Sequence, residues 1–196
     1  MELTVPEGSP VAVDGVMQPD EWGDCVIVEV REGVTLYAKH ADGFLLLALA
    51  TQEPVVGNVL TLAGDTLRIM HSSAALGTAL YERSGDLWRR TQDFVWRCRS
   101  RSLTSSALAQ RESFLEDERW MASITYMGER NHLEYQIANP SEIERLALVL
   151  LPASHPKDFF SWPADLDQDL LPGPIPAEGR AVTQTWPTLR LVTARE

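Results

Sequence analysis

A nearly continuous apolar run, Phe44 to Thr51, constrains the fold of this chain more than any other feature. The run has the usual length of a strand. Because almost every position is apolar, it predicts a strand that is covered on both faces. It begins directly after Asp42-Gly43, and Asp-Gly between two apolar runs is a strong hairpin signal. The sequence therefore predicts a central strand that pairs with the run before it, 34–40.

Short strands and turn signals alternate along the rest of the chain. Further strands are expected at 26–30, 66–71, 78–82, 93–98, 146–151 and 188–192, and a hairpin should pair 120–127 with 132–138. Helical spacing predicts one helix over 105–118, and capping-box spacing suits a helical turn at 141–144. Seven prolines predict a long loop over 152–187. This pattern indicates the all-β class, a two-sheet antiparallel β-sandwich with one or two short helices and a long Pro-rich C-terminal loop, in one domain spanning 1–196.

Composition limits the partners and the location. The chain carries 28 acidic and 17 basic residues and has a formal net charge of −11, so nucleic acids and anionic lipid surfaces would be repelled. No apolar run approaches the ~20 residues of a membrane-spanning helix. No secretion leader is visible, so we expect a cytoplasmic protein, or an extracellular one if a signal lies upstream. In the cytoplasm Cys25 and Cys98 would be free thiols.

Two turns precede a large aromatic residue near the N-terminus. Residues 13–15 (Val-Asp-Gly) form the first, since glycine takes the positive φ of a tight bend, and residues 19–20 (Pro-Asp) form the second. Trp22 follows and is expected to be a buried anchor, because a packed Trp buries up to about 250 Å². The order Val-Asp-Gly, then Glu-Trp at 21–22, resembles the opening of the family 9 carbohydrate-binding modules and their DOMON-like relatives.

Further motifs of that family recur in the same order. Residues 42–49 are similar to its acidic turn and apolar strand, and residues 65–69 resemble its Asp-x-Val/Leu-x-Ile strand. Trp120 and residues 134–137 fit its late Trp … Glu-x-x-Ile pattern, without the proline that directly follows in the family. A Trp, here Trp186, often precedes the last strand. The resemblance implies a two-sheet antiparallel sandwich, often with sugar binding and sometimes with structural calcium, and the wider superfamily includes haem-binding domains.

Tryptophan stacking is the leading prediction for function. Sugar sites need flat aromatic platforms together with polar groups for the hydroxyls. In the sugar-binding relatives two Trp clamp the saccharide, one of them near the C-terminus, which implies Trp186 with Trp88 or Trp96 as its partner. The polar residues expected to help are Arg89, Arg97 and Gln184. The sequence thus predicts a non-catalytic carbohydrate-binding module.

Two cofactors follow from the same resemblance. Asp165, Asp167 and Asp169 alternate as in calcium loops, although a Leu stands where an EF-hand requires Gly. They are the candidate ligands for a structural calcium ion, and no other cofactor is expected. A DOMON-type haem is a weaker alternative, because adjacent strand residues such as Met70 and His71 point to opposite faces and cannot both ligate one iron.

No catalytic motif accompanies these features. The four histidines are scattered, and the Gly-x-Ser-x-Gly, His-Glu-x-x-His and phosphate-loop patterns do not occur. We therefore expect a protein that is not an enzyme. The competing hypothesis to sugar binding is an intracellular interaction or accessory sandwich without a sugar site, so the expected partner is a saccharide or another protein.

Overall fold

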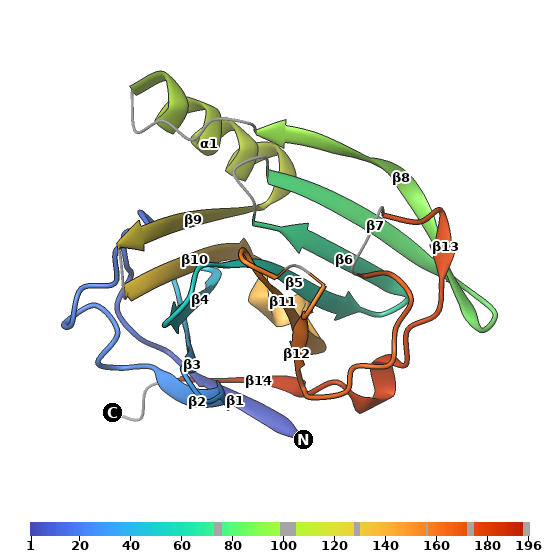
Figure 1. The fold of residues 1–196 in the computed structure, drawn as a ribbon, viewed down its shortest axis with the longest axis horizontal. Coiled ribbons are helices and arrows are strands. Elements are labelled where there is room, and N and C mark those ends of the chain that lie inside the picture. Colours follow the sequence, from blue (N-terminus) through green and yellow to red (C-terminus); the bar gives the residue numbers. More distant parts are fainter. Residues whose placement is uncertain (73–75, 99–104, 128–129, 156, 172–174, 194–196) are drawn as a thin grey trace.

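Two β-sheets account for most of the structure (Figure 1). The computed structural model describes residues 1–72, 76–98, 105–127, 130–155, 157–171 and 175–193. Within these, a five-stranded antiparallel sheet has the order β2-β3-β4-β10-β9. Its strands are β2 (Val26–Arg31), β3 (Val34–Ala41), β4 (Phe44–Thr51), β10 (Arg130–Ala138) and β9 (Trp120–Met127).

The second sheet has nine strands and joins the two ends of the described chain. Its order is β1-β14-β11-β5-β6-β7-β8-β13, with β12 paired to β11, and only β1 and β14 run parallel. The strands are β1 (Glu2–Pro6), β5 (Val55–Ala63), β6 (Thr66–His71), β7 (Leu76–Ser84), β8 (Leu87–Cys98), β11 (Arg145–Pro152), β12 (Phe160–Trp162), β13 (Glu178–Gly179) and β14 (Thr188–Val192). The helical elements are α1 (Ser105–Glu118), η1 (Pro140–Glu142) and η2 (Thr183–Thr185).

The predicted all-β sandwich is confirmed, with β4 as the middle strand of its sheet. The predicted helix 105–118 coincides with α1, and the hairpin 120–138 forms β9 and β10. Four strands were not predicted: β1, β5, and the short β12 and β13 inside the expected loop 152–187. The expected strand 93–98 is only the end of the longer β8. That the chain is one domain stays a prediction. Among the described residues no helix is long and apolar enough to cross a membrane.

The space between the sheets holds the largest hydrophobic cluster. Trp120 lies at its centre, with the ring of Phe114 from α1 against its edge at 5.2 Å and the ring of Tyr135 stacked at 6.1 Å. The indole Nε1 of Trp120 donates to Thr78 Oγ1 across the sheets at 2.7 Å. Trp120 thus ties β9 and α1 to β7, because a buried indole N–H needs an acceptor.

Each sheet also buries side chains on its outer face, away from the other sheet. On the five-stranded sheet the N-terminal segment 7–25 supplies Trp22, which packs with Leu46 and Ala48 of β4. On the nine-stranded sheet the C-terminal segment 163–187 supplies Leu170 and Trp186, which pack over β5, β6, β7 and β11. The central strands are therefore covered on both faces, which explains the continuous apolar sequence of β4.

Candidate functional site

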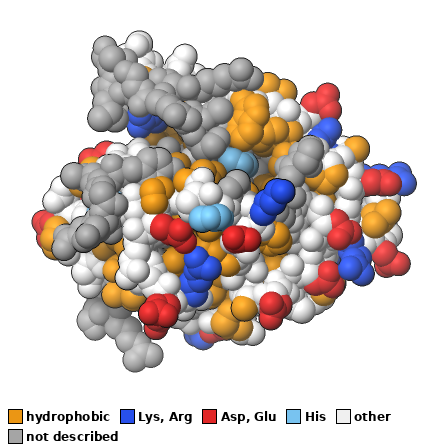
Figure 2. Space-filling view, in the orientation of Figure 1, with side chains coloured by type: hydrophobic (Ala, Val, Ile, Leu, Met, Phe, Trp, Pro, Cys, Tyr) orange, Lys and Arg blue, Asp and Glu red, His pale blue; other side chains and the backbone are white. Residues whose placement is uncertain are grey.

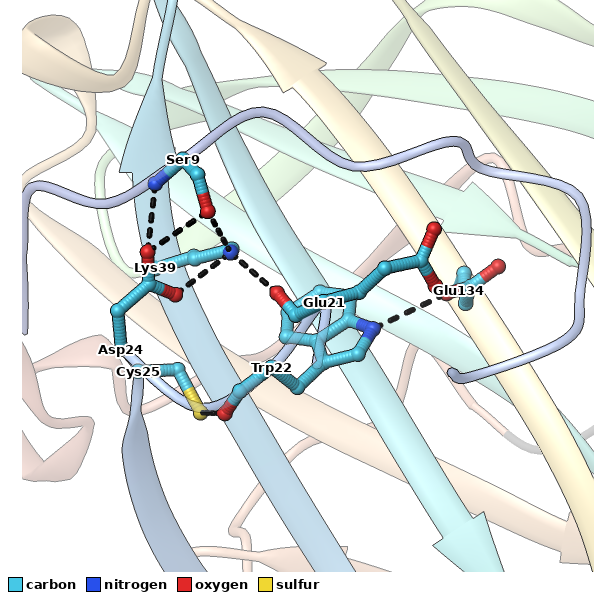
Figure 3. Close-up of polar contacts among 7 residues, drawn as sticks. All are labelled: Ser9, Glu21, Trp22, Asp24, Cys25, Lys39 and Glu134. Atoms are coloured by element: carbon cyan, nitrogen blue, oxygen red, sulfur yellow. Dashed lines mark hydrogen bonds and ion pairs between the residues drawn. The ribbon is translucent and has the colours of Figure 1, made fainter. Parts of the chain in front are cut away.

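The Asp-Gly and Glu-Trp turns fasten the N-terminal segment to the five-stranded sheet. Trp22 is buried, and its Nε1 donates to Glu134 Oε1 of β10 at 3.3 Å (Figure 3). The backbone N–H groups of Asp14 and Gly15 donate to the other oxygen, Oε2, at 3.1 and 2.7 Å. Gly15 has φ +88, and a Cβ there would lie 2.7 Å from Thr125 Oγ1, so the close approach requires glycine. The opening motif is therefore an anchor.

A buried cation completes this anchor. Lys39 is fully buried, and its Nζ donates to Asp24 Oδ1 at 2.7 Å and to the carbonyl of Glu21 (Figure 3). Burial opposes ionisation of Asp24, but hydrogen bonds from Lys39 and Ser9 outweigh it and lower the pKa of Asp24 to about 2. The Cys25 thiol donates to the Trp22 carbonyl, and burial raises its pKa, so it stays protonated. These contacts hold a loop and leave no activated nucleophile.

Two of the three tryptophans predicted to form a sugar clamp are buried. Trp88 is 2% exposed and its Nε1 donates to the carbonyl of Ala181 at 3.1 Å, while Trp186 is 0% exposed. Both belong to the hydrophobic cluster on the outer face of the nine-stranded sheet. Neither ring therefore offers a free face to a saccharide. The burial of both rings does not favour the predicted clamp, because the C-terminal segment that carries Trp186 folds back over the sheet.

The polar residues predicted for the same site do not gather at one place. Arg89 pairs with Glu178 at 3.6 Å and Arg97 pairs with Glu118 at 2.7 Å. Both arginines lie on β8, where eight residues of extended strand span about 26 Å. Gln184 is exposed on η2, beside the buried Trp186. A single saccharide unit cannot contact all three.

Trp96 is the predicted platform residue that remains partly exposed. Its ring meets the ring of His71 on β6 edge to face at 4.8 Å and the ring of Phe94 at 4.7 Å. Gly77 of β7 lies beneath them, since a Cβ there would overlap the Phe94 ring and approach Trp96 to 3.1 Å. Figure 2 shows hydrophobic side chains gathered beside a histidine near the middle of the view. The glycine thus makes room for an aromatic cluster on the sheet surface.

The aromatic cluster forms one end of a row of paired residues that crosses the sheet and ends at a buried amide. Asn58 of β5 pairs in register with His71, His71 pairs with Gly77, and Gly77 pairs with Trp96. Asn58 is 0% exposed, and neither its Oδ1 nor its Nδ2 has a hydrogen-bond partner within the described residues. Buried side-chain amides in native proteins almost always have partners. Four neighbouring strands therefore carry an amide, an imidazole, a glycine and an indole along one line of about 14 Å.

The histidine in this row is neutral at physiological pH. Burial lowers the pKa of His71 to about 4, because the protein interior disfavours the charged imidazolium. A neutral imidazole has one nitrogen that donates and one that accepts. The row therefore combines aromatic surface with uncharged polar groups.

Two of the three aspartates predicted to bind calcium have other contacts. Asp167 Oδ1 accepts from the guanidinium of Arg180 at 3.1 Å, and Asp169 Oδ2 accepts from the Arg180 backbone N–H at 3.2 Å. Asp165 stands in a turn with φ 57. The described residues contain no group of three His, Cys, Asp or Glu side chains that could hold a metal ion. The aspartates on either side of Gln168 thus join two parts of the C-terminal segment.

The remaining candidates are separated by the sheets. Met70 is buried between the two sheets while His71 lies on the outer face, as their adjacent positions on a strand predict. Cys98 is buried between the sheets as well, whereas Cys25 packs on the outer face of the five-stranded sheet. The structure records both cysteines as free.

No family model, curated protein or solved structure matches this chain. The resemblance to family 9 carbohydrate-binding modules and DOMON-like domains therefore stays a prediction.

Sequence reasoning found Trp96 but missed its neighbours. Asn58 was missed because strand β5 was not expected, and Gly77 because the expected strand began one residue later. The signal that was available is the valine and leucine content of 55–62, which suits a strand despite Gly57 and Asn58. Gly57 has a packing reason, because a Cβ there would lie 3.0 Å from the Tyr135 hydroxyl oxygen.

Proposed function

We propose that this chain is a non-catalytic saccharide-binding module whose platform is Trp96 on the outer face of the nine-stranded sheet. The observation that carries the proposal is the partly exposed indole of Trp96, which lies at one end of a row of paired residues. The other end of the row is the fully buried amide of Asn58, which has no partner among the described residues. The site differs from the predicted clamp, because Trp88 and Trp186 serve as core residues.

The chemistry of the row suits a neutral sugar. A pyranose ring presents C–H groups that pack on an aromatic face, and its hydroxyls need donors and acceptors at fixed positions. Phe94 and His71 hold the Trp96 ring from two sides, which lowers the entropy lost when a ligand stacks on it. Because His71 is neutral at pH 7, the row attracts no ion in particular.

The proposal is for binding alone. Hydrolysis of a glycosidic bond uses two carboxyl groups that face one another across the bond. The row supplies an amide, an imidazole and an indole instead of such a pair. Binding without turnover is the activity that these groups support.

Intrinsic fluorescence tests the proposal, because Trp96 is the tryptophan that a ligand can contact directly, and the Trp96→Ala variant identifies its share of the signal. The other five tryptophans, Trp22, Trp88, Trp120, Trp162 and Trp186, are all buried. Titration with a panel of neutral mono- and oligosaccharides should give a saturable change in emission. Trp96→Ala should abolish that change, whereas Val95→Ala should retain it, since Val95 is 50% exposed on the same strand and points away from the cluster.

Two results would contradict the proposal. One is the absence of any saturable change across the panel, with calcium or with a chelator. The other is a change that persists in a folded Trp96→Ala variant, since the ligand would then bind elsewhere. Either result would favour the competing hypothesis of a protein-interaction module.

A further inference from the structure

A cleft lies on the inner face of the nine-stranded sheet, beside the end of α1. Arg68 of β6, Leu80 of β7 and Gln92 of β8 stand in one row of paired residues and line it. Arg68 faces inward, because its neighbours Leu67 and Ile69 both pack in the outer cluster. The cleft has a volume of about 470 Å³. It lies on the face opposite the Trp96 row, so it is a separate site.

The cleft is positively charged although the chain is acidic. Its charged lining consists of Arg68, Arg97, Arg119, Asp117 and Glu118. Three guanidinium groups thus face two carboxylates, a formal balance of +1 in a chain of −11. The C-terminal end of α1 adds about half a negative charge, which leaves the lining itself positive, although the carboxylate of Glu142, outside the lining, also acts on Arg68.

Two of the three arginines form no carboxylate ion pair in the part of the chain that the structure describes. Arg97 is engaged, since its Nε lies 2.7 Å from Glu118 Oε1. Arg68 and Arg119 form no ion pair within the described part of the chain, and the only hydrogen bond of the Arg68 guanidinium found there is a long one of 3.5 Å to the Glu118 carbonyl. Burial lowers the pKa of Arg68, which shows that its charge is partly withdrawn from water. The carboxylates of Glu118 and Glu142 act on Arg68 electrostatically but form no ion pair with it in the described residues, so an added oxyanion would supply the direct partner.

We infer that this cleft binds a small anion, a ligand with a carboxylate or phosphoryl group, between Arg68 and Arg119. Guanidinium groups bind both kinds of oxyanion through paired N–H donors. Gln92 adds an amide to the same lining, and the Thr78 hydroxyl is free to donate because its oxygen accepts from Trp120. The inference does not rest on the proposed sugar site.

Calorimetric titration of the whole chain with inorganic phosphate and, separately, with succinate tests the inference. Ionic strength is held constant with sodium chloride, because screening weakens exposed charges. Arg68→Gln and Arg119→Gln should each weaken binding about tenfold, the usual effect of losing a charged hydrogen bond. Arg190→Gln is the control, since Arg190 is exposed and pairs with Glu2 on β1. Its affinity should equal that of the parent chain.

The outcomes separate the two ligand chemistries. Saturable binding of phosphate alone assigns a phosphoryl ligand, and binding of succinate alone assigns a carboxylate; either supports the inference. Arg119 is exposed, so Arg119→Gln remains informative even if Arg68→Gln fails to fold. The inference is overturned if neither anion binds more strongly than chloride, or if binding is unchanged in a folded Arg119→Gln variant. The arginines would then serve only to cap α1.

Discussion

The outer face of each sheet carries a tryptophan and a buried polar side chain. The two faces differ in whether that polar side chain has hydrogen-bond partners. On the five-stranded sheet, Glu134 accepts three N–H groups and Trp22 is sealed beneath the N-terminal segment. On the nine-stranded sheet, Asn58 has no partner among the described residues and Trp96 is partly exposed. A satisfied polar group stabilises a fold, whereas an unsatisfied one is a candidate for ligand recognition.

The largest difference is expected between the two tryptophans. Trp22→Ala should lower the free energy of unfolding by about 3–5 kcal/mol, because it empties a packed cavity and frees Glu134. Trp96→Ala should cost about 1 kcal/mol or less, since the ring is partly exposed at the sheet surface. Urea denaturation of both variants measures this difference. Equal losses would mean that Trp96 is a structural residue like Trp22.

The contrast between the two faces could be predicted from the sequence only in part. Strong local signals gave the strands of the five-stranded sheet, the helix and Trp22 as a buried anchor. The long-range partners could not be predicted, because Glu134 lies 112 residues from Trp22 and meets it only after β10 pairs with β4. Trp186 was assigned to a clamp from its position near the C-terminus, as in the sugar-binding relatives. Sequence position does not show which way the C-terminal segment folds, so the burial of Trp186 could not be predicted.

Replacement of Glu134 should give the next largest effect. Glu134→Leu leaves the N–H groups of Asp14, Gly15 and Trp22 without their acceptor, at a cost of about 3 kcal/mol. Glu134→Gln retains one carbonyl oxygen and should cost less. Denaturant midpoints with unchanged m-values report both losses. If the Glu134→Leu variant were as stable as the parent chain, Glu134 would not stabilise the anchor.

The two faces should also respond to pH with opposite sign. Burial raises the pKa of Glu134 to about 7, with Gly15 and Trp22 opposing, so the folded state retains a proton that the unfolded state releases above its ordinary 4.5. The contribution of Glu134 to the free energy of unfolding is fully present below pH 4.5. It falls as the pH rises to about 7, by up to about 1.4 kcal/mol per pH unit. The depressed pKa of His71, about 4, contributes stability that is present above pH 6.5 and is lost as pH falls toward 4.

Two variants separate these opposing contributions. In Glu134→Gln the free energy of unfolding should rise with pH between 4.5 and 6.5, because the His71 contribution remains. In His71→Gln it should fall over the same interval. Urea denaturation at half-unit pH steps measures the slopes. Identical slopes in the two variants would show that neither group titrates as described.

The smallest stability change is expected at Asn58. Asn58→Leu replaces an amide that has no partner among the described residues by an apolar side chain of similar size, so the free energy of unfolding should change by less than about 1 kcal/mol. The same variant should weaken saccharide binding about tenfold if the amide contacts a hydroxyl. A large loss of stability would reveal a structural partner for the amide.

Nuclear magnetic resonance of the ¹⁵N-labelled chain during titration with a responsive saccharide tests the central claim most directly. The indole N–H of Trp96 and the side-chain amide of Asn58 should shift together and saturate at the same concentration. The indole N–H of Trp22, bonded to Glu134, should stay in place. Shifts of Trp22 without Trp96, or saturable shifts that leave both Trp96 and Asn58 unchanged, would contradict the account.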